Sequence, residues 1–192
     1  MQLHKHDVVD AATAILDSHG IADLTMRRLA RELNVSPGAL YWHFANKQHL
    51  LGAIADRILT PARGLPAAAD WRDRIVAVCS ALRDALLSHT DGAELVSASL
   101  AAGQSEVAGE ILAALSAAAA DAGVAANEAE LAARTVIYYV LGFTVDEQSK
   151  LQWDSAGVLD PEESAATIDH DHRFGFGLRL LIDGLGVIAP VR

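Results

Sequence analysis

The sequence predicts an all-α protein: a three-helix head at the N-terminus joined to a larger helical body, with about nine helices in total. Apolar residues recur at helical spacing along most of the 192 residues. Hydrophobic residues make up 52% of the chain, largely alanine and leucine, and aromatic residues only 5%. That balance is typical of a helical core. Runs in which β-branched residues alternate with polar ones, the pattern of a strand, are hard to find.

The head begins with two helices of unequal length. Asp7 is placed to cap the first, whose apolar residues from Val8 to Leu16 follow a helical period. Gly20 tolerates a positive φ and is expected to end this helix. Thr25 then caps a short second helix over 26–33.

A tight turn separates the second helix from a third. Asn34 belongs to the few non-glycine residue types that adopt the left-handed conformation readily, so it suits the turn. Ser36 caps the next helix, and Pro37 fits its first position, where no backbone N–H is needed. This third helix is short and ends near Phe44, and Asn46 caps a fourth, longer helix.

Pro61 and Gly64 mark a hinge after the fourth helix. We therefore expect a helix-turn-helix domain over residues 1–46, a connecting helix over 47–62 and a helical domain over 63–192. In this last domain, apolar spacing and turn residues predict helices over about 71–86, 93–101, 105–122, 127–151 and 164–184. Asn127 is expected to cap the helix over 127–151.

Charge is unevenly distributed between these parts. The formal net charge is −10. Residues 1–60 contain six basic and six acidic side chains, whereas the remainder contains nine basic and nineteen acidic ones. A nucleic acid would be repelled by the body and could approach only the head. The overall acidity therefore confines DNA binding to the head without excluding it.

The sequence lacks the marks of a secreted, membrane-bound or redox protein. No apolar stretch reaches the ~18 residues of a membrane span, and the N-terminus lacks the layout of a signal peptide. Cys79 is the only cysteine, so no internal disulfide can form, and its apolar neighbours indicate ordinary packing. These features predict a cytoplasmic protein.

The second and third helices have the pattern of a DNA-binding helix-turn-helix. Two short capped helices joined by a tight turn have this geometry, and the second inserts its N-terminal half into the major groove. The first residues of that helix must be small for close approach to DNA. Ser36, Pro37, Gly38 and Ala39 meet this condition.

Side chains with hydrogen-bonding tips surround this small start. Tyr41, Trp42 and His43 can reach phosphates or base edges, although the alternative for Tyr41 and Trp42 is a place in the core. Arg27, in the first turn of the second helix, can donate two hydrogen bonds to a guanine edge. Lys47 can add its charge to the N-terminal amides of the fourth helix at a phosphate.

Several runs of residues resemble the TetR family of transcriptional regulators, in particular its tetracycline-repressor branch. The most specific is Leu40-Tyr41-Trp42-His43 with Asn46-Lys47 behind it. The matching runs are 24–30, 33–35 and 40–47 in the head, and 85–93, 141–142, 146–148, 176–178 and 181–185 in the body. The resemblance implies a ligand-responsive repressor that binds a palindromic operator as a homodimer, with an effector-binding and dimerisation domain over 63–192.

The resemblance also implies which head residues contact the operator: Thr25, Arg27, Tyr41, His43 and Lys47. Together with the residues of the motif, the DNA-binding candidates are Thr25, Arg27, Ser36, Gly38, Ala39, Tyr41, Trp42, His43 and Lys47. Pro37, Gly38 and Ala39 stand where the tetracycline-repressor branch carries bulkier or base-reading side chains. The operator sequence is therefore expected to differ from that of the branch.

The body departs from the branch at its metal-dependent drug site. Val96 stands at the position of a histidine that ligates drug-bound magnesium, and it cannot ligate a metal. Asp146 stands where a carboxylate holds metal-bound water, and Leu100-Ala101 replaces an arginine–proline pair. We expect an effector other than a magnesium–tetracycline complex, and neither a cofactor nor a bound metal.

We expect instead a largely apolar effector pocket with a few polar groups, the usual design of a small-molecule site. The apolar candidates are Val78, Leu82, Val96 and Leu100, with Ser99 beside them, and the polar candidates are Tyr138, Tyr139 and Asp146. Plain helix packing is the alternative for each of these residues.

The last two long helices are expected to form the dimer. Two such helices from each chain would give a four-helix interface with two-fold symmetry. The apolar stripe expected there consists of Phe174, Leu178, Leu181, Ile182 and Leu185. The fourth helix would act as the lever that joins effector binding to the separation of the two heads.

Three other functions are weighed against this interpretation. Asp146 and Glu147 are adjacent acids that could suggest an enzyme, but neighbours on a helix diverge by ~100° and cannot flank one bond. A metal-responsive regulator would use Asp169, His170, Asp171 and His172, and two histidines two residues apart on a helix point in nearly opposite directions. An activating regulator has the same sequence features as a repressor.

Overall fold

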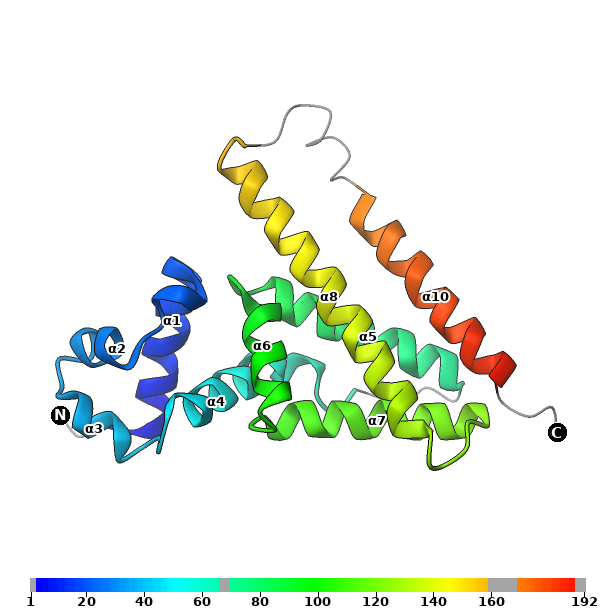
Figure 1. The fold of residues 1–192 in the computed structure, drawn as a ribbon, viewed down its shortest axis with the longest axis horizontal. Coiled ribbons are helices and arrows are strands. Elements are labelled where there is room, and N and C mark those ends of the chain that lie inside the picture. The colour runs from blue at the N-terminus through cyan, green and yellow to red at the C-terminus, as the bar shows by residue number, and fades with distance from the viewer. Residues whose placement is uncertain (1–2, 66–69, 159–168, 189–192) are drawn as a thin grey trace. The chain divides into compact units, whose positions relative to one another are not determined.

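The computed structural model describes residues 3–65, 70–158 and 169–188, and within these ranges all regular structure is helical (Figure 1). Nine α-helices and one short 3₁₀ helix lie in the described ranges, which confirms the all-α class. None of these helices is both long enough and apolar enough to cross a membrane.

Three of the four α-helices in the head begin at the predicted caps. Its elements are α1 (Lys5–Asp23), α2 (Met26–Glu32), α3 (Pro37–Tyr41), α4 (Lys47–Leu59) and the 3₁₀ helix η1 (Thr60–Ala62). Thr25 Oγ1 accepts a hydrogen bond from the Arg28 amide at 3.2 Å, and Ser36 Oγ accepts one from the Ala39 amide at 3.3 Å. Asn46 Oδ1 accepts a third from the His49 amide at 2.9 Å. The three predicted N-caps are therefore confirmed.

Asn34 also has the predicted left-handed conformation, with φ +52°. The start and the end of α1 differ from prediction. His4 occupies the N-cap position, and Asp7 is the third helical residue, whose carboxylate reaches back to accept the His4 amide at 2.8 Å. Gly20, with φ +76°, kinks the helix but does not end it, because the chain resumes helical geometry as far as Asp23.

The body contains five described helices. They are α5 (Trp71–Leu87), α6 (Gly92–Ala101), α7 (Glu106–Ala122), α8 (Ala129–Ser155) and α10 (His170–Ile188). Asn127 does not cap α8, because the amides of Glu128 and Ala129 both bond to the Ala125 carbonyl and so form a turn ahead of the helix. The expected last helix begins at 164, which lies outside the described residues, and its described part ends at Ile188.

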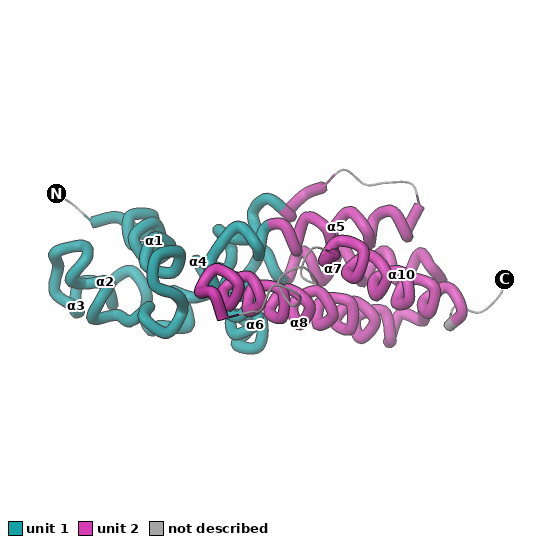
Figure 2. The backbone as a smooth tube through the Cα atoms, turned by 90° about the horizontal axis from the view of Figure 1, so that it is seen from above, with its two compact units in different colours: residues 1–61, 85–108 teal, residues 62–84, 109–192 magenta. Residues whose placement is uncertain are grey.

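The chain forms two compact units (Figure 2). Unit 1 comprises Met1–Pro61 and Ala85–Ala108, and unit 2 comprises Ala62–Asp84 and Gly109–Arg192. Unit 1 thus holds α6 together with the head helices. The division into parts over 1–46, 47–62 and 63–192 stays a prediction.

The core of unit 1 is made by large aliphatic and aromatic side chains from each head helix. Burying one such side chain contributes roughly 1.5–3 kcal/mol. The fully buried members include Leu16, Leu29, Leu40, Phe44, Leu50, Ile54 and Ile58. This core holds α2 and α3 in place while their polar faces stay exposed.

The contact between α4 and the turn after α6 leaves no room for a side chain on Gly52. A Cβ atom built there would lie 2.8 Å from the carbonyl carbon of Gln104, a backbone atom that cannot move aside alone. We expect Gly52→Ala to destabilise the protein by about 1–3 kcal/mol, the usual cost of overpacking.

For a chain of this length that loss corresponds to a fall in Tm of about 2–12 °C, measured by thermal unfolding. Gly109→Ala is the matched control, because no atom apart from the neighbouring backbone of its own helix lies within 4 Å of the added Cβ, and alanine favours the helix. An unchanged Tm in Gly52→Ala would contradict this packing.

In unit 2, α10 packs on α8 through the apolar stripe that the sequence predicted for dimerisation. Phe174, Leu178, Ile182 and Leu185 are buried within the chain itself, and only Leu181 is partly exposed. For Phe174, Leu178, Ile182 and Leu185 the assignment to a dimer interface is therefore wrong, whereas Leu181 remains available to a partner. The helical period identifies a buried face, but it does not say which helix covers that face.

Candidate nucleic-acid interface

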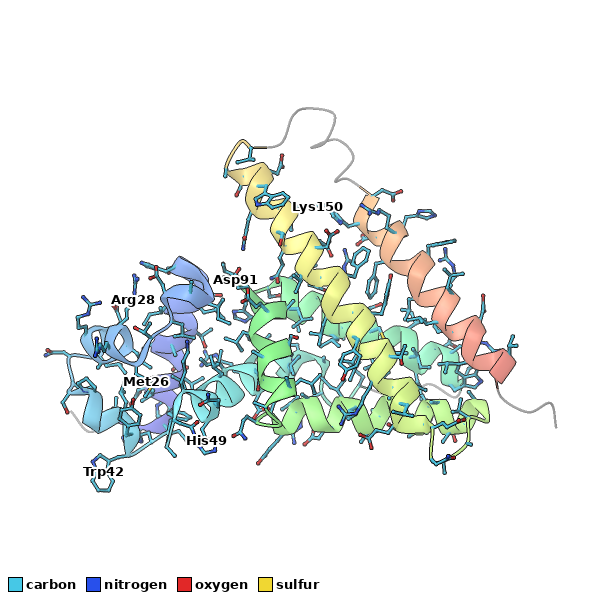
Figure 3. The ribbon with its side chains drawn as sticks, in the orientation of Figure 1. Met26, Arg28, Trp42, His49, Asp91 and Lys150 are labelled. Atoms are coloured by element: carbon cyan, nitrogen blue, oxygen red, sulfur yellow. The ribbon has the colours of Figure 1, made fainter. Side chains whose placement is uncertain are left out.

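The third helix is fixed to the head by one face and exposes the other. Leu40 and Phe44, four residues apart, are 0% and 2% exposed and anchor the segment in the core. Tyr41 and Trp42 lie on the opposite side and are 49% and 91% exposed. Figure 3 shows the Trp42 ring projecting away from the head. The alternative that these two rings belong to the core is therefore rejected.

The start of α3 is small and accessible. Ser36, Pro37 and Gly38 are exposed, and Ala39 is half-buried. The Ser36 hydroxyl caps the helix, so the backbone at this end is held in one conformation. A groove of DNA can approach this backbone closely because no long side chain stands in front of it.

Hydrogen-bond donors flank α3 on the neighbouring helices. Arg27 is exposed in the first turn of α2 and has no ion pair or hydrogen bond among the described residues, whereas Arg28 beside it pairs with Asp23 at 3.2 Å. Thr25 is exposed at the cap of α2. His43 and Lys47 are half-buried, and Lys47 is the first residue of α4.

This part of unit 1 is locally basic although the head as a whole is neutral. Between residues 24 and 50, the basic side chains are Arg27, Arg28, Arg31 and Lys47, and the only acidic one is Glu32. The other head carboxylates lie outside this segment, and several of them bind partners in unit 1. The pairs are Asp10 with Arg57, Asp17 with His89, and Asp23 with Arg28. A polyanion is thus favoured at this face.

The predicted effector residues of unit 1 lie on α6. Val96 is buried, Leu100 is half-buried, and Ser99 is 1% exposed. The Ser99 hydroxyl has no hydrogen-bond partner in the described structure, which is unusual for a buried polar atom.

The predicted effector residues of unit 2 have different surroundings. Leu82 is buried, Val78 is half-buried, and the Tyr139 hydroxyl donates to the Phe174 carbonyl at 2.7 Å. Tyr138 is 59% exposed on the surface of α8. Asp146 is exposed and pairs with Lys150 at 2.7 Å (Figure 3 labels Lys150). Effector contact by each of these residues stays a prediction.

Sequence reasoning missed a buried ion pair in unit 2. Arg83 donates from Nε and Nη2 to the two Glu147 oxygens at 2.8 and 2.6 Å, and from Nη1 to Asp171 at 2.7 Å. Its hydrogen bonds to Glu147 raise the pKa of Arg83 further, against the effect of burial. One sequence signal could have indicated that Arg83 is buried. Arg83 stands four residues after Cys79, so the two side chains share one face of α5, and Cys79 is buried.

These contacts separate the residues considered for catalysis and metal binding. Glu147 binds Arg83 while Asp146 binds Lys150, so the two adjacent acids serve different partners. In the metal candidate, Asp171 binds Arg83 and His172 lies 3.4 Å from Asp169. Within the described ranges no three histidine, cysteine or acidic side chains are placed to hold one metal ion.

The thiol of Cys79 is also unsuited to chemistry. It is fully buried, and burial raises its pKa to about 12. It is therefore a thiol, not a nucleophilic thiolate, at neutral pH.

Two family models match the chain in sequence. Residues 8–54 match the bacterial regulatory proteins of the tetR family, and residues 63–160 match the tetracyclin repressor-like C-terminal domain. Tetracycline repressor protein class A from transposon 1721 of Escherichia coli is 32% identical, over 96% of this chain and 91% of that protein.

Solved structures give a closer match. Mycobacterium smegmatis BioQ is 65% identical, with a TM-score of 0.91 over 98% of this chain and 100% of that one. A structure of BioQ with its natural double-stranded DNA operator is 64% identical, with a TM-score of 0.85 over 96% of this chain and 99% of that one.

Proposed function

The chain belongs to the TetR family of bacterial regulatory proteins, and from this premise we propose that it is a ligand-responsive transcriptional repressor that binds a palindromic operator as a homodimer. The observation that carries the proposal is the exposure of Tyr41 and Trp42 on the side of α3 opposite the buried Leu40 and Phe44. We name the exposed surface that contains Arg27, Tyr41 and Trp42 the reading face. The similar BioQ structure that contains its operator supports it. Action on DNA would place the protein in the cytoplasm.

Each candidate side chain has a distinct role in operator binding. Arg27 is free to read a guanine edge, since no carboxylate among the described residues competes for its guanidinium. Tyr41 and His43 donate to base edges or phosphates, and Thr25 retains its hydroxyl proton for a phosphate. Lys47 and the first amides of α4 bind another phosphate. The small side chains at 36–39 let the backbone approach the groove.

A test of this face is Trp42→Ala. The side chain is 91% exposed, so the Tm is expected to stay within about 1 °C of the wild type. Affinity for a duplex selected on the full-length protein from a random DNA library is expected to fall about tenfold or more, because two hydrogen bonds to charged phosphates are lost per dimer.

Fluorescence anisotropy on the labelled duplex measures this change. Trp153→Ala on α8 is the matched control, since Trp153 is also exposed but lies in unit 2. Unchanged affinity in Trp42→Ala would remove Trp42 from the interface.

The proposed dimer uses the outer faces of α8 and α10. Large apolar side chains are exposed there: Leu131 and Tyr138 on α8, and Phe176, Leu180 and Val187 on α10. An apolar groove of about 360 Å³ lies between the two helices, lined among others by Val124, Leu131, Leu180 and Leu181. We propose that the same two helices of a second chain cover this surface, which gives the two-fold symmetry that a palindrome requires.

The effector is proposed to be a largely apolar small molecule. Val96 offers no metal ligand, and the Asp146 carboxylate is engaged by Lys150. The unpartnered Ser99 hydroxyl is available for one hydrogen bond to the bound molecule. Effector binding would shift an equilibrium between a DNA-binding and a DNA-releasing state of the protein, with α4 as the lever between the effector site and the reading face. The size of the shift is limited by the difference in effector affinity between the two states.

Isothermal titration calorimetry with tetracycline and Mg²⁺ tests the effector proposal. We expect no tight binding, because half of the metal site is absent. A parallel titration in excess chelator gives the metal-independent baseline. Tight binding that depends on magnesium would contradict the proposal while leaving the DNA-binding function intact.

A further inference from the structure

The turn between α5 and α6 is bonded to the C-terminal end of α1. The His89 Nδ1 atom lies 3.0 Å from a carboxylate oxygen of Asp17, and the Thr90 hydroxyl donates to the Asp17 carbonyl at 2.9 Å. The Asp91 carboxylate accepts a hydrogen bond from the Ile21 amide at 2.9 Å. Three consecutive residues, His89, Thr90 and Asp91, therefore hold one helix end, and we name them the α1 clasp.

Asp91 has a local conformation that few residue types adopt. Its φ of +52° lies in the left-handed region, which apart from glycine is visited mainly by asparagine and aspartate. It also occupies the N-cap position of α6, yet its side chain makes no capping hydrogen bond to that helix. The carboxylate extends instead toward α1, as Figure 3 shows at its label. Contacts with α1 thus take precedence over the local preferences of α6.

The backbone at Gly20 leaves room for the Asp91 carboxylate. Its φ of +76° interrupts α1, which leaves the next amide, that of Ile21, pointing at Asp91. A Cβ on Gly20 would lie 2.6 Å from Asp91 Oδ2, closer than such atoms approach. The kink in α1 and the left-handed conformation of Asp91 thus both serve the hydrogen bond between the Ile21 amide and the Asp91 carboxylate.

A second attachment lies at the other end of α6. Asp56 on α4 accepts hydrogen bonds from the Ser105 hydroxyl at 2.6 Å and the Val107 amide at 3.0 Å. Within unit 1, the head is therefore held to α6 and its flanking turns at two places, through α1 and through α4. A head held only through α4 could turn about that helix, whereas a head held at two points cannot.

We propose that the α1 clasp fixes the orientation of the reading face and so sets the half-site spacing that the operator must have. The proposal rests on the proposed function of a homodimer on a palindrome. One added base pair moves a half-site by about 3.4 Å and turns it by about 35°. Heads of fixed orientation bind well at one spacing, and heads that can turn tolerate several.

The test compares operator spacing profiles of wild-type and variant proteins. Asp91→Gly removes the carboxylate and keeps the left-handed backbone without strain, and Asp91→Asn keeps an acceptor oxygen. Affinities are measured by anisotropy on the selected duplex and on versions with one base pair removed, one added and two added. We expect the wild type and Asp91→Asn to lose about tenfold or more per altered base pair. We expect Asp91→Gly to lose less than about threefold.

Two further measurements test whether loss of the α1 clasp, and not another effect of the substitution, changes the spacing profile. Hydrogen exchange of the full chain is expected to speed up at residues 17–23 in Asp91→Gly and to stay unchanged in α2 and α3. Gly20→Ala, which displaces the carboxylate from the other side, is expected to broaden the spacing profile in the same way.

If the wild type binds the operator but Asp91→Gly has an unchanged spacing profile, the inference about the α1 clasp is wrong while the proposed function stands. Unchanged hydrogen exchange at Ile21 in Asp91→Gly has the same consequence. Failure of the wild type to bind any selected palindrome overturns the proposed function and the inference with it.

Discussion

Replacing Arg27 with alanine is expected to weaken binding of the selected duplex by a factor between about 30 and about 25,000. A bidentate contact to a guanine edge contributes about 1–3 kcal/mol, and a symmetric dimer loses two such contacts at once. The effect is large because Arg27 has no ion pair among the described residues, so its guanidinium is not drawn away from the DNA. Specificity at one position of each half-site is expected to relax as well.

The control for Arg27→Ala is Arg63→Ala. Arg63 carries the same charge, but it lies in unit 2 and binds Glu110 at 2.6 Å, so its loss changes the net charge without touching the reading face. Affinities of both variants are compared by anisotropy at two salt concentrations. Equal losses in the two variants would mean that Arg27 acts only through long-range charge.

Replacing Glu147 with leucine is expected to destabilise the protein by about 3–5 kcal/mol, because the buried Arg83 loses its bidentate partner. Arg83 and Glu147 have side chains only 10% and 5% exposed, so water cannot compensate for the loss. Asp171 does not substitute for Glu147, since it binds a different guanidinium nitrogen and its side chain is 93% exposed. For this chain length the fall in Tm is about 6–20 °C.

A double variant separates the charge from the packing. Arg83→Leu combined with Glu147→Leu removes both buried charges, and it is expected to recover most of the lost stability. Lys150→Leu is the control nearer the surface, because its partner Asp146 has a side chain 59% exposed and such a pair contributes about 0–1 kcal/mol. Equal Tm values for Glu147→Leu and Lys150→Leu would contradict the buried pair.

Local chemistry made much of the head predictable from sequence. Thr25, Ser36 and Asn46 each cap a helix through an amide three residues away, so the signal and its partner lie in one short window. Asn34 follows the same logic, because the left-handed turn depends on its own side chain. For Tyr41 and Trp42 the sequence left two alternatives, and the structure decides for exposure because Leu40 and Phe44 occupy the buried side.

Contacts between distant parts of the chain could not be predicted in this way. Glu147 is 64 residues from Arg83, and Asp17 is 72 from His89, so no sequence window contains either pair. The apolar stripe of α10 was recognised as buried, but its partner was misassigned because the helical period does not specify which helix covers it. Asp7 and Asn127 were misplaced because polar residues near a helix start can act from more than one position.

Selection from a random DNA library on the full-length protein decides whether the head binds an operator as a homodimer through the face that contains Arg27, Tyr41 and Trp42. We expect enrichment of a palindrome whose two half-sites are each protected by one head, and loss of that enrichment in Arg27→Ala. Recovery of no common sequence, or of a single asymmetric site, would contradict it.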